Sequence, residues 1–507
     1  MIKQTYKKWI AACTVTSSLL LGACTSTPPS VRDVSIVPLP NNVQQDSSAF
    51  VLPKSCTIGI TDSRLAPAAE YLTGILSPST GYNIKVQDGE GTITLSLGEV
   101  EGKEGAYQLK TDTKKINIKG NSYGGVIAGI ESLRQLFPPQ IESKQIVDGV
   151  DWAIPSVEIN DAPRFTWRGI MLDVSRHFYS KDEVKELLDV MALYKMNKFH
   201  WHLTDDQGWR IEIKKYPLLT EKGAWRKFNS HDKECIRQSK VNDNPDMAIP
   251  ESKIRIVEGD TLYGGYYTQE DIKEVIAYAK VRGIDIVPEI DMPGHFSAAI
   301  KVYPELSCTG EAGWGEEFSY PICPSRPENY QFVQSIIDEM VEIFPSEYFH
   351  IGADEVEKDN WEQCEVCQRL MQQEGYQKVD ELQNRFVKIM TNYVKGKGKK
   401  VMGWDDAFLE KEPQDLIYTY WRDWLPDQPG KITQKGYPII FMEWSRFYLS
   451  ATPSDEGLSS LYNFEFEPQF PGIVKQNVLG FQACVWTEMI PNERKFGQHV
   501  FPSLQAF

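Results

Sequence analysis

Hydrophobic and polar positions follow two different rhythms along the chain, and the change falls near Pro163. Before it, short runs with period-two alternation predict strands at residues 57–60, 92–97 and 115–118. Residues 124–136 have helical spacing and end before two prolines. We therefore predict a small α+β domain over residues 37–162. No catalytic group of residues is visible in it, so we expect a supporting role.

After residue 163 the pattern becomes a repeated succession of strand, loop and helix. The predicted strands are residues 168–173, 197–203, 284–290, 348–353, 400–404, 416–421, 438–443 and 479–486. The predicted helices are residues 181–194, 269–281, 330–344 and 381–394. Alternation of this kind is typical of parallel strands with crossover helices, and eight units close a (β/α)₈ barrel. We predict an α/β fold with a barrel domain over residues 163–507, and an exposed loop over the polar stretch 228–259.

The pattern at residues 501–507 is typical of the first turn of the last barrel helix, and the printed chain ends there. We expect an incomplete eighth helix. It would leave strands one and eight partly uncovered, although parallel sheets need both faces buried. The expected consequence is reduced stability.

The first residues predict export and a lipid anchor. Lys3, Lys7 and Lys8 precede an apolar stretch over residues 9–21 that is too short to span a membrane comfortably. Leu21-Gly22-Ala23-Cys24 resembles a bacterial lipobox, with Cys24 as the lipidated residue. The alternative is a plain signal peptide with an incidental cysteine. We predict a signal peptide over residues 1–24, a tether over 25–36, and an outer-membrane location because no Asp follows Cys24.

Composition narrows the classes of partner. Hydrophobic residues make up 41% of the 507, which is enough to bury a sizeable core. The formal charge of −16 argues against nucleic acid and against an anionic membrane surface, so a lipid would be the only membrane contact. The 13 tryptophans suit either a core or stacking on sugar rings.

The nine cysteines suggest no catalytic pair. Cys364-x-x-Cys367 has the spacing of half a zinc site, but no second pair lies at a suitable distance along the chain. A local disulfide or two free thiols is the simpler interpretation. Cys308 and Cys323 bracket a glycine-containing loop and would be able to bridge it. We expect neither a metal nor a cofactor.

Carboxylates and tryptophans recur where the predicted strands end. In a (β/α)₈ barrel the active residues lie at the C-terminal ends of the strands, so these side chains should gather in one place. They are Asp173, Asp205, Asp206, Asp291, His295, Asp354, Glu355, Trp404, Asp405, Trp421, Glu443, Trp486 and Glu488. Such a set suits a sugar-cleaving pocket better than a phosphate site.

Several of these stretches together resemble glycoside hydrolase family 20, the β-N-acetylhexosaminidases. His350-Ile351-Gly352-Ala353-Asp354-Glu355 resembles the family's H-x-G-G-D-E motif, with Ala353 in place of the second glycine. The other matching stretches, in the family's order, are residues 168–173, 200–210, 288–295, 403–405 and 486–488. The resemblance covers about residues 37–507 and implies a retaining exo-glycosidase.

The resemblance also implies a mechanism in which the substrate's 2-acetamido oxygen attacks the anomeric carbon. Glu355 would be the general acid and then the base, and Asp354 would orient the acetamido group. Tyr448 would donate to the acetamido oxygen, and Asp205 and His295 would form a relay to Glu355. The implied binding residues are Arg168, Trp404, Asp405, Trp421, Trp486 and Glu488.

Each assignment has a structural alternative. Asp354 and Glu355 would also suit the N-terminus of a following helix. The tryptophans would also suit barrel packing, Arg168 an ordinary ion pair, and His295 a loop contact. His200 and His202 alternate along a strand, so we expect that at most one faces the pocket. Ser450 stands where family members commonly have Asp, which leaves the preference between GlcNAc and GalNAc open. Two other functions compete: a catalytically weak sugar-binding lipoprotein, and a hydrolase for a different sugar.

Overall fold

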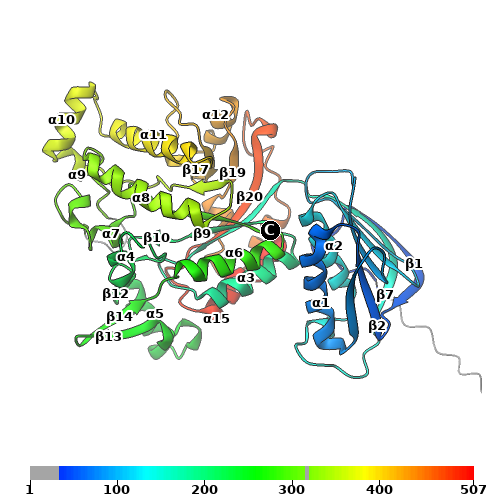
Figure 1. The fold of residues 1–507 in the computed structure, drawn as a ribbon. Coiled ribbons are helices and arrows are strands. Elements are labelled where there is room, and N and C mark those ends of the chain that lie inside the picture. The colour runs from blue at the N-terminus through cyan, green and yellow to red at the C-terminus, as the bar shows by residue number, and fades with distance from the viewer. Residues whose placement is uncertain (1–32, 314–318) are drawn as a thin grey trace, which may run out of the picture.

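The computed structural model describes residues 33–313 and 319–507. The predicted signal peptide, Cys24 and the tether up to residue 32 lie outside the described residues. Two bodies are visible in Figure 1, a smaller domain built on one sheet and a larger barrel. In the described part of the chain no helix is both long and apolar enough to span a bilayer.

The smaller domain is a seven-stranded mixed sheet with two helices on one face. Its strands lie in the order β1-β7-β5-β6-β4-β2-β3. Their bounds are β1 Asn42–Val51, β2 Ser55–Ile60, β3 Asn83–Asp88, β4 Ile93–Leu97, β5 Tyr107–Thr111, β6 Ile116–Gly120 and β7 Ala153–Asp161. Helices α1 (Ala66–Thr80) and α2 (Tyr123–Leu136) bury their apolar faces against the alternating Ile and Leu side chains of this sheet. The predicted α+β domain is confirmed.

The larger domain is a closed barrel of eight parallel strands. Their bounds are β8 Trp167–Asp173, β9 Lys198–His202, β15 Asp285–Glu289, β16 Tyr348–His350, β17 Lys400–Trp404, β18 Ile417–Tyr420, β19 Ile439–Phe441 and β20 Val478–Val485. The helices around it include α3 Lys181–Leu193, α6 Gln269–Val281, α8 Pro327–Ile343, α11 Asp380–Gly396, α12 Gln428–Gln434, α14 Asp455–Tyr462 and α15 Glu493–Val500. Each predicted strand and helix is present, and the (β/α)₈ prediction is confirmed.

Strand residues alternate between the barrel interior and the helix layer, since successive side chains point to opposite faces. Inside, Met171, Val287, Met402, Ile440 and Cys484 form one buried cluster. Outside, the strands pack on the apolar faces of α3, α6, α8 and α11, which form the main core. These two layers fix the strand ends rigidly, and the loops that follow the strands carry the candidate site.

The two domains touch through their helices. In Figure 1 α1 and α2 face α3 and α6 of the barrel. The Tyr123 hydroxyl donates to the Val281 carbonyl at 2.8 Å, and Lys195 Nζ lies 3.3 Å from Asp161 Oδ2. These contacts are far from the loops that follow the barrel strands, so the smaller domain supports the barrel from outside.

The polar stretch 228–259 is not the exposed loop that its composition predicts. It contains α5 (Ser230–Val241) and the hairpin strand β13 (Ile254–Val257), which pairs with β14 (Asp260–Gly264). Asn229 and Asp232 cap α5 reciprocally, each side chain accepting from the other's backbone N–H. This capping box is a readable helix start that the high polarity of the stretch concealed.

The chain also folds so that two pairs of cysteines, which lie far apart in the sequence, meet in space. Cys308 and Cys323 lie in the segment between α7 (Ser297–Ile300) and α8, and they contact Cys367 at the start of α10 (Glu365–Glu374). The spacing argument that left Cys364-x-x-Cys367 without a second pair is therefore wrong. It measured separation along the chain, whereas the barrel loops bring the second pair through space.

Candidate active site

A cavity of about 270 Å³ opens at the C-terminal end of the barrel strands. Residues from the loops after six strands line it. They are Arg176 after β8; His295 after β15; Asp354 and Glu355 after β16; Trp421 after β18; and Trp444, Tyr448 and Ser450 after β19. Trp486 and Glu488, after β20, complete the lining. This is the location that the barrel architecture predicts for reactive groups. Seven of these ten are residues that the sequence analysis assigned to the site: His295, Asp354, Glu355, Trp421, Tyr448, Trp486 and Glu488.

A tight turn after β16 presents the two acidic residues. Gly352 has φ 68°, and a Cβ there would lie 1.7 Å from Asp291 Oδ1, so only glycine fits. Ala353 and Glu355 also have positive φ, 78° and 46°, in the region that non-glycine residues avoid. The strained turn takes both carboxyls off the strand, so the alternation of strand side chains no longer separates them.

Both carboxyls approach the same imidazole nitrogen. His295 Nε2 lies 3.7 Å from Asp354 Oδ2 and 3.6 Å from Glu355 Oε2. The Asp354 side chain is 10% exposed, whereas that of Glu355 is 36% exposed. One acid is thus held in the wall of the cavity and the other reaches into it, which suits a fixed electrostatic role for Asp354 and proton transfer for Glu355.

Asp354 shares its environment with a second buried acid. Oxygen atoms of Asp291 and Asp354 and a ring nitrogen of His295 all lie within 4.8 Å of one another. Burial and, next, the neighbouring Asp291 charge raise the pKa of Asp354 well above its ordinary value. Asp291 Oδ1 also accepts the Ala353 N–H at 3.1 Å. Asp291 therefore holds the turn in place and also raises the pKa of Asp354.

The predicted relay from Asp205 through His295 to Glu355 is present in space. His295 Nδ1 lies 3.2 Å from Asp205 Oδ1, on the side of the ring opposite to Glu355. Burial acts to lower the pKa of His295, but Asp205 outweighs it and raises the pKa well above the ordinary value. His295 is therefore a cation that faces the carboxyl groups of the cavity, with its own backbone strained at φ 50°.

Asp205 belongs to a wider buried network centred on Glu289. His202 Nε2 lies 2.8 Å from Asp205 Oδ2, and its Nδ1 lies 2.5 Å from Glu289 Oε2. Burial opposes the charge, but Glu289 and Asp205 raise the pKa of His202 to about 10. His200 Nε2 and His350 Nδ1 also contact Glu289, at 2.9 and 3.0 Å. His200 and His202 both contact Glu289, because residues two apart on a strand share a face. Neither lines the cavity, which is consistent with the expectation that at most one of them faces the pocket.

Arg168 is not in the cavity, and that prediction is wrong. It lies at the N-terminal start of β8, where Nε and Nη1 donate to the carbonyls of Lys195 and Phe165 at 2.9 and 2.8 Å. Arg176, beyond the other end of β8, takes the place that the sequence analysis gave to Arg168. The resemblance placed an arginine near strand one, but the strand direction shows which arginine reaches the site.

Arg176 is surrounded by acids. Its guanidinium lies 2.9 Å from Asp205 Oδ2, 3.4 Å from Asp173 Oδ2 and 3.8 Å from Glu488 Oε1. Its Cζ lies 4.9 Å from the centre of the Trp486 ring. Asp173 in turn accepts the Ser175 and Thr487 N–H groups, so it joins the ends of β8 and β20. Asp173 is thus structural, and Arg176 links this support to the cavity wall.

The three predicted tryptophans differ in role. Trp421 and Trp486 line the cavity, whereas Trp404 lies beneath it, fully buried, with Nε1 donating to Glu289 at 2.9 Å. Asp405 is also fully buried, so its prediction as a sugar contact is wrong. It accepts the Trp421 N–H at 3.0 Å and pairs with Arg422 at 2.9 Å, which holds the Trp421 loop in place.

Tyr448 and Ser450 both line the cavity, so the loop after β19 presents both side chains to the site. Burial raises the pKa of Tyr448 well above its ordinary value, so its hydroxyl keeps its proton and remains a donor. Ser450 Oγ lies 3.3 Å from the Trp486 N and 3.2 Å from the Trp486 O, turned toward the backbone. Trp444, which sequence reasoning missed, forms an exposed rim at 56% exposure.

Two of the missed residues had readable signals. Arg176 follows Asp173 by three positions, within the loop where a barrel places its active groups. Trp444 directly follows Glu443, which the sequence analysis placed at a strand end. The exposure of Trp444 depends on how its loop turns, and no local pattern gives that.

Comparison with known proteins agrees with this architecture. Residues 165–507 match the model "Glycosyl hydrolase family 20, catalytic domain", and residues 33–162 match "Glycosyl hydrolase family 20, domain 2". A "Beta-hexosaminidase" of Vibrio furnissii is 34% identical over 93% of this chain and 76% of its own length. One of Porphyromonas gingivalis is 32% identical over 94% of this chain, which spans only 60% of that relative.

Among solved structures, the GH20 exo β-N-acetylglucosaminidase of Vibrio harveyi, in complex with N-acetylglucosamine, superposes with a TM-score of 0.78. It is 31% identical, and the alignment covers 95% of this chain and 74% of that one.

Proposed function

Because the chain belongs to glycosyl hydrolase family 20, we propose that it is a retaining exo-glycosidase that removes terminal β-linked N-acetylhexosamine from glycans. The observation that carries the proposal is the pairing of a buried Asp354 with an accessible Glu355 at one end of a small aromatic cavity. At about 270 Å³ the cavity is slightly smaller than most ligand pockets, which start at roughly 300 Å³, and this size suits a single terminal sugar.

The first chemical step uses the substrate as its own nucleophile. Glu355 gives its proton to the glycosidic oxygen while the acetamido carbonyl oxygen bonds to the anomeric carbon. The bond to the leaving group breaks, and an oxazolinium intermediate forms. Asp354 accepts from the acetamido N–H and stabilises the positive charge, and Tyr448 donates to the acetamido oxygen.

The second step reverses the proton transfer. The Glu355 carboxylate takes a proton from water, whose oxygen attacks the anomeric carbon and reopens the acetamido group. Two inversions give net retention. Cationic His295, 3.6 Å from Glu355, balances the charge on this carboxylate between the steps. Holding the acetamido oxygen against the anomeric carbon supplies proximity worth about 7–11 kcal/mol in well-oriented systems.

The experiment is a series of aryl glycosides whose N-acetyl group carries one, two or three fluorine atoms. Fluorine makes the acetamido oxygen a poorer nucleophile, so the rate should fall at each addition. A rate indifferent to fluorination would contradict the proposal, since an enzyme carboxylate would then be the nucleophile.

Glu355→Gln serves as the matched variant. Its rate should fall by about 10²–10⁴-fold on substrates with poor leaving groups, because these leaving groups need the proton. On dinitrophenyl glycosides, whose leaving group needs no proton, the rate of the first step should fall far less. The weak sugar-binding alternative gains no support, because the acid, the oriented carboxylate and the tyrosine donor all line one cavity.

We also propose that Cys24 carries a lipid that holds the protein on the outer membrane. The support is the run of Lys3, Lys7 and Lys8, the short apolar stretch, and Leu21-Gly22-Ala23-Cys24. Cys24→Ser should move the protein from the membrane fraction to the soluble fraction after cell lysis. Unchanged membrane retention in this variant would contradict the anchor.

A further inference from the structure

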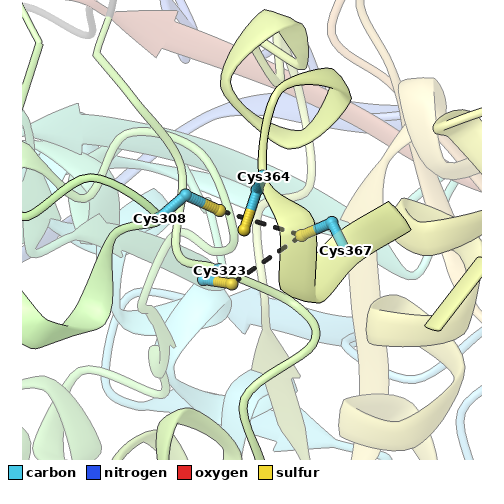
Figure 2. A group of neighbouring side chains, drawn as sticks. All are labelled: Cys308, Cys323, Cys364 and Cys367. Carbon is cyan, nitrogen blue, oxygen red and sulfur yellow. Dashed lines mark hydrogen bonds between the residues drawn. The ribbon is translucent and has the colours of Figure 1, made fainter. Parts of the chain in front are cut away.

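Four cysteine side chains from two separate segments of the barrel loops point toward one centre (Figure 2). Cys308 and Cys323 come from the segment between α7 and α8, and Cys364 and Cys367 come from the start of α10. The four sulfur atoms all lie within 4.8 Å of one another. Cys323 and Cys367 are buried, whereas Cys308 and Cys364 are partly accessible.

The distances are those of a metal site. Cys367 Sγ lies 3.7 Å from Cys308 Sγ and also 3.7 Å from Cys323 Sγ. Zinc binds thiolates at about 2.3 Å in a tetrahedron, whose edge between two sulfurs is then about 3.8 Å. A disulfide would need about 2.0 Å and a single partner for Cys367. Cys367 instead has two equidistant neighbours.

We propose that Cys308, Cys323, Cys364 and Cys367 form a structural Zn²⁺ site with four thiolate ligands. Four protein ligands fill the tetrahedron and leave no position for water or substrate, so the metal would have no part in the reaction itself. Cys364-x-x-Cys367 supplies one half of the site with the short spacing typical of structural zinc. The proposal does not rest on the glycosidase activity, because metal content can be measured without a substrate.

The surroundings fit a closed structural site. Val356, Trp361, Met371 and Leu382 form an apolar shell around the cysteines. Arg326 donates to the Cys308 carbonyl at 3.2 Å, which brings a positive charge next to a site whose four thiolates exceed the charge of the metal by two. An apolar shell limits the access of water to the metal-bound sulfurs.

The site would hold two catalytic loops in place. Val356, in the apolar shell, directly follows Glu355 in the chain. The Ile322 N–H donates to the Pro293 carbonyl at 2.9 Å, two residues before His295, and Ile322 is the neighbour of Cys323. The Trp361 Nε1–H donates to the Ile322 carbonyl at 3.2 Å. A metal that joins these segments would therefore position Glu355 and His295, neither of which it touches.

The test begins with the metal content of the full chain, purified without chelators and measured by plasma mass spectrometry. We expect about one zinc per chain, and cobalt exchanged into the site should show thiolate-to-metal absorption typical of tetrahedral coordination. Cys367→Ser should lose most of the zinc. Cys235→Ser, which changes a buried cysteine outside the group, should keep it.

Cys364→His covers the case in which Cys367→Ser does not fold, because three cysteines and one histidine also bind structural zinc. This variant should retain the metal. Stripping zinc from the native protein should lower its melting temperature and reduce kcat, and zinc should restore both.

Two outcomes would overturn the proposal. The first is a metal-free protein whose mass shows the loss of hydrogens on disulfide formation and whose four cysteines resist alkylation until reduced. The second is a reduced protein that takes up no zinc or cobalt when either is supplied.

Discussion

Arg176 should contribute directly to sugar binding, and its replacement by methionine measures how much. The guanidinium contacts Asp205 at 2.9 Å and borders Glu488 at 3.8 Å in the cavity wall, with 11% of its side chain exposed. It can therefore donate to a sugar hydroxyl while the acids hold it in place. Hydrogen bonds to charged groups contribute about 1.5–3 kcal/mol, which corresponds to a loss of roughly 10- to 160-fold in kcat/KM.

The same variant should lose stability, because removal of Arg176 leaves Asp173 and Asp205 with less compensation. Breaking a buried ion pair from one side costs about 3–5 kcal/mol. The two effects are separated by measuring kcat/KM on an aryl β-N-acetylglucosaminide at a temperature well below unfolding, and urea unfolding in parallel.

Arg168→Met is the matched control, since Arg168 lies at the opposite end of the same strand and binds only backbone carbonyls. It should destabilise the protein and leave kcat/KM within about threefold, because the lost donors do not reach the cavity. The reasoning would be refuted if Arg168→Met lowered kcat/KM of the folded enzyme as much as Arg176→Met does.

Three further substitutions test other parts of the account. Ala353→Gly should stabilise the protein by about 1 kcal/mol in urea unfolding, because glycine tolerates the φ of 78° without strain, and an unchanged or lower midpoint would contradict this. Asp291→Asn removes a negative neighbour of Asp354, so the pKa of Asp354 should fall toward its ordinary value and the acid limb of the kcat/KM profile should move to lower pH. The free energy of unfolding of this variant, relative to the wild type, should increase as the pH rises above about 4, because the folded wild type keeps protons on these two acids that the unfolded chain releases there. A difference in stability that does not depend on pH would contradict the interaction between Asp291 and Asp354. Trp444→Ala should raise KM for oligosaccharides more than for aryl glycosides, because its exposed ring lies at the rim beyond the terminal sugar, and equal effects would remove it from the binding surface.

The barrel was predictable because its strands and helices have clear periods and appear in strict alternation. Residues 400–404 and 269–281, predicted from hydrophobic pattern alone, coincide with β17 and α6. The helix α5 was missed because a polar, solvent-facing helix carries little hydrophobic period, and only its capping box at Asn229 marked its start.

The acidic pair was predictable from its motif and its place after a strand, but its geometry was not. The sequence does not show that positive φ at Ala353 and Glu355 brings both carboxyls to one histidine. Arg168 and Arg176 were confused because both flank one strand, and only the strand direction decides which end meets the cavity. Contacts between distant segments, such as those of Cys308 and Cys323 with Cys367, depend on the closed barrel.

The most direct test of the account compares an aryl β-N-acetylglucosaminide with the corresponding aryl β-glucoside, using the same purified protein and following the first sugar product by proton NMR. The substrate's acetamido group is the proposed nucleophile, so hydrolysis should occur only with the acetamido sugar and should release the β-anomer first. Glu355→Gln should slow it by about 10²–10⁴-fold when the aryl leaving group is a poor one. Comparable hydrolysis of both glycosides, or release of the α-anomer first, would contradict the substrate-assisted mechanism.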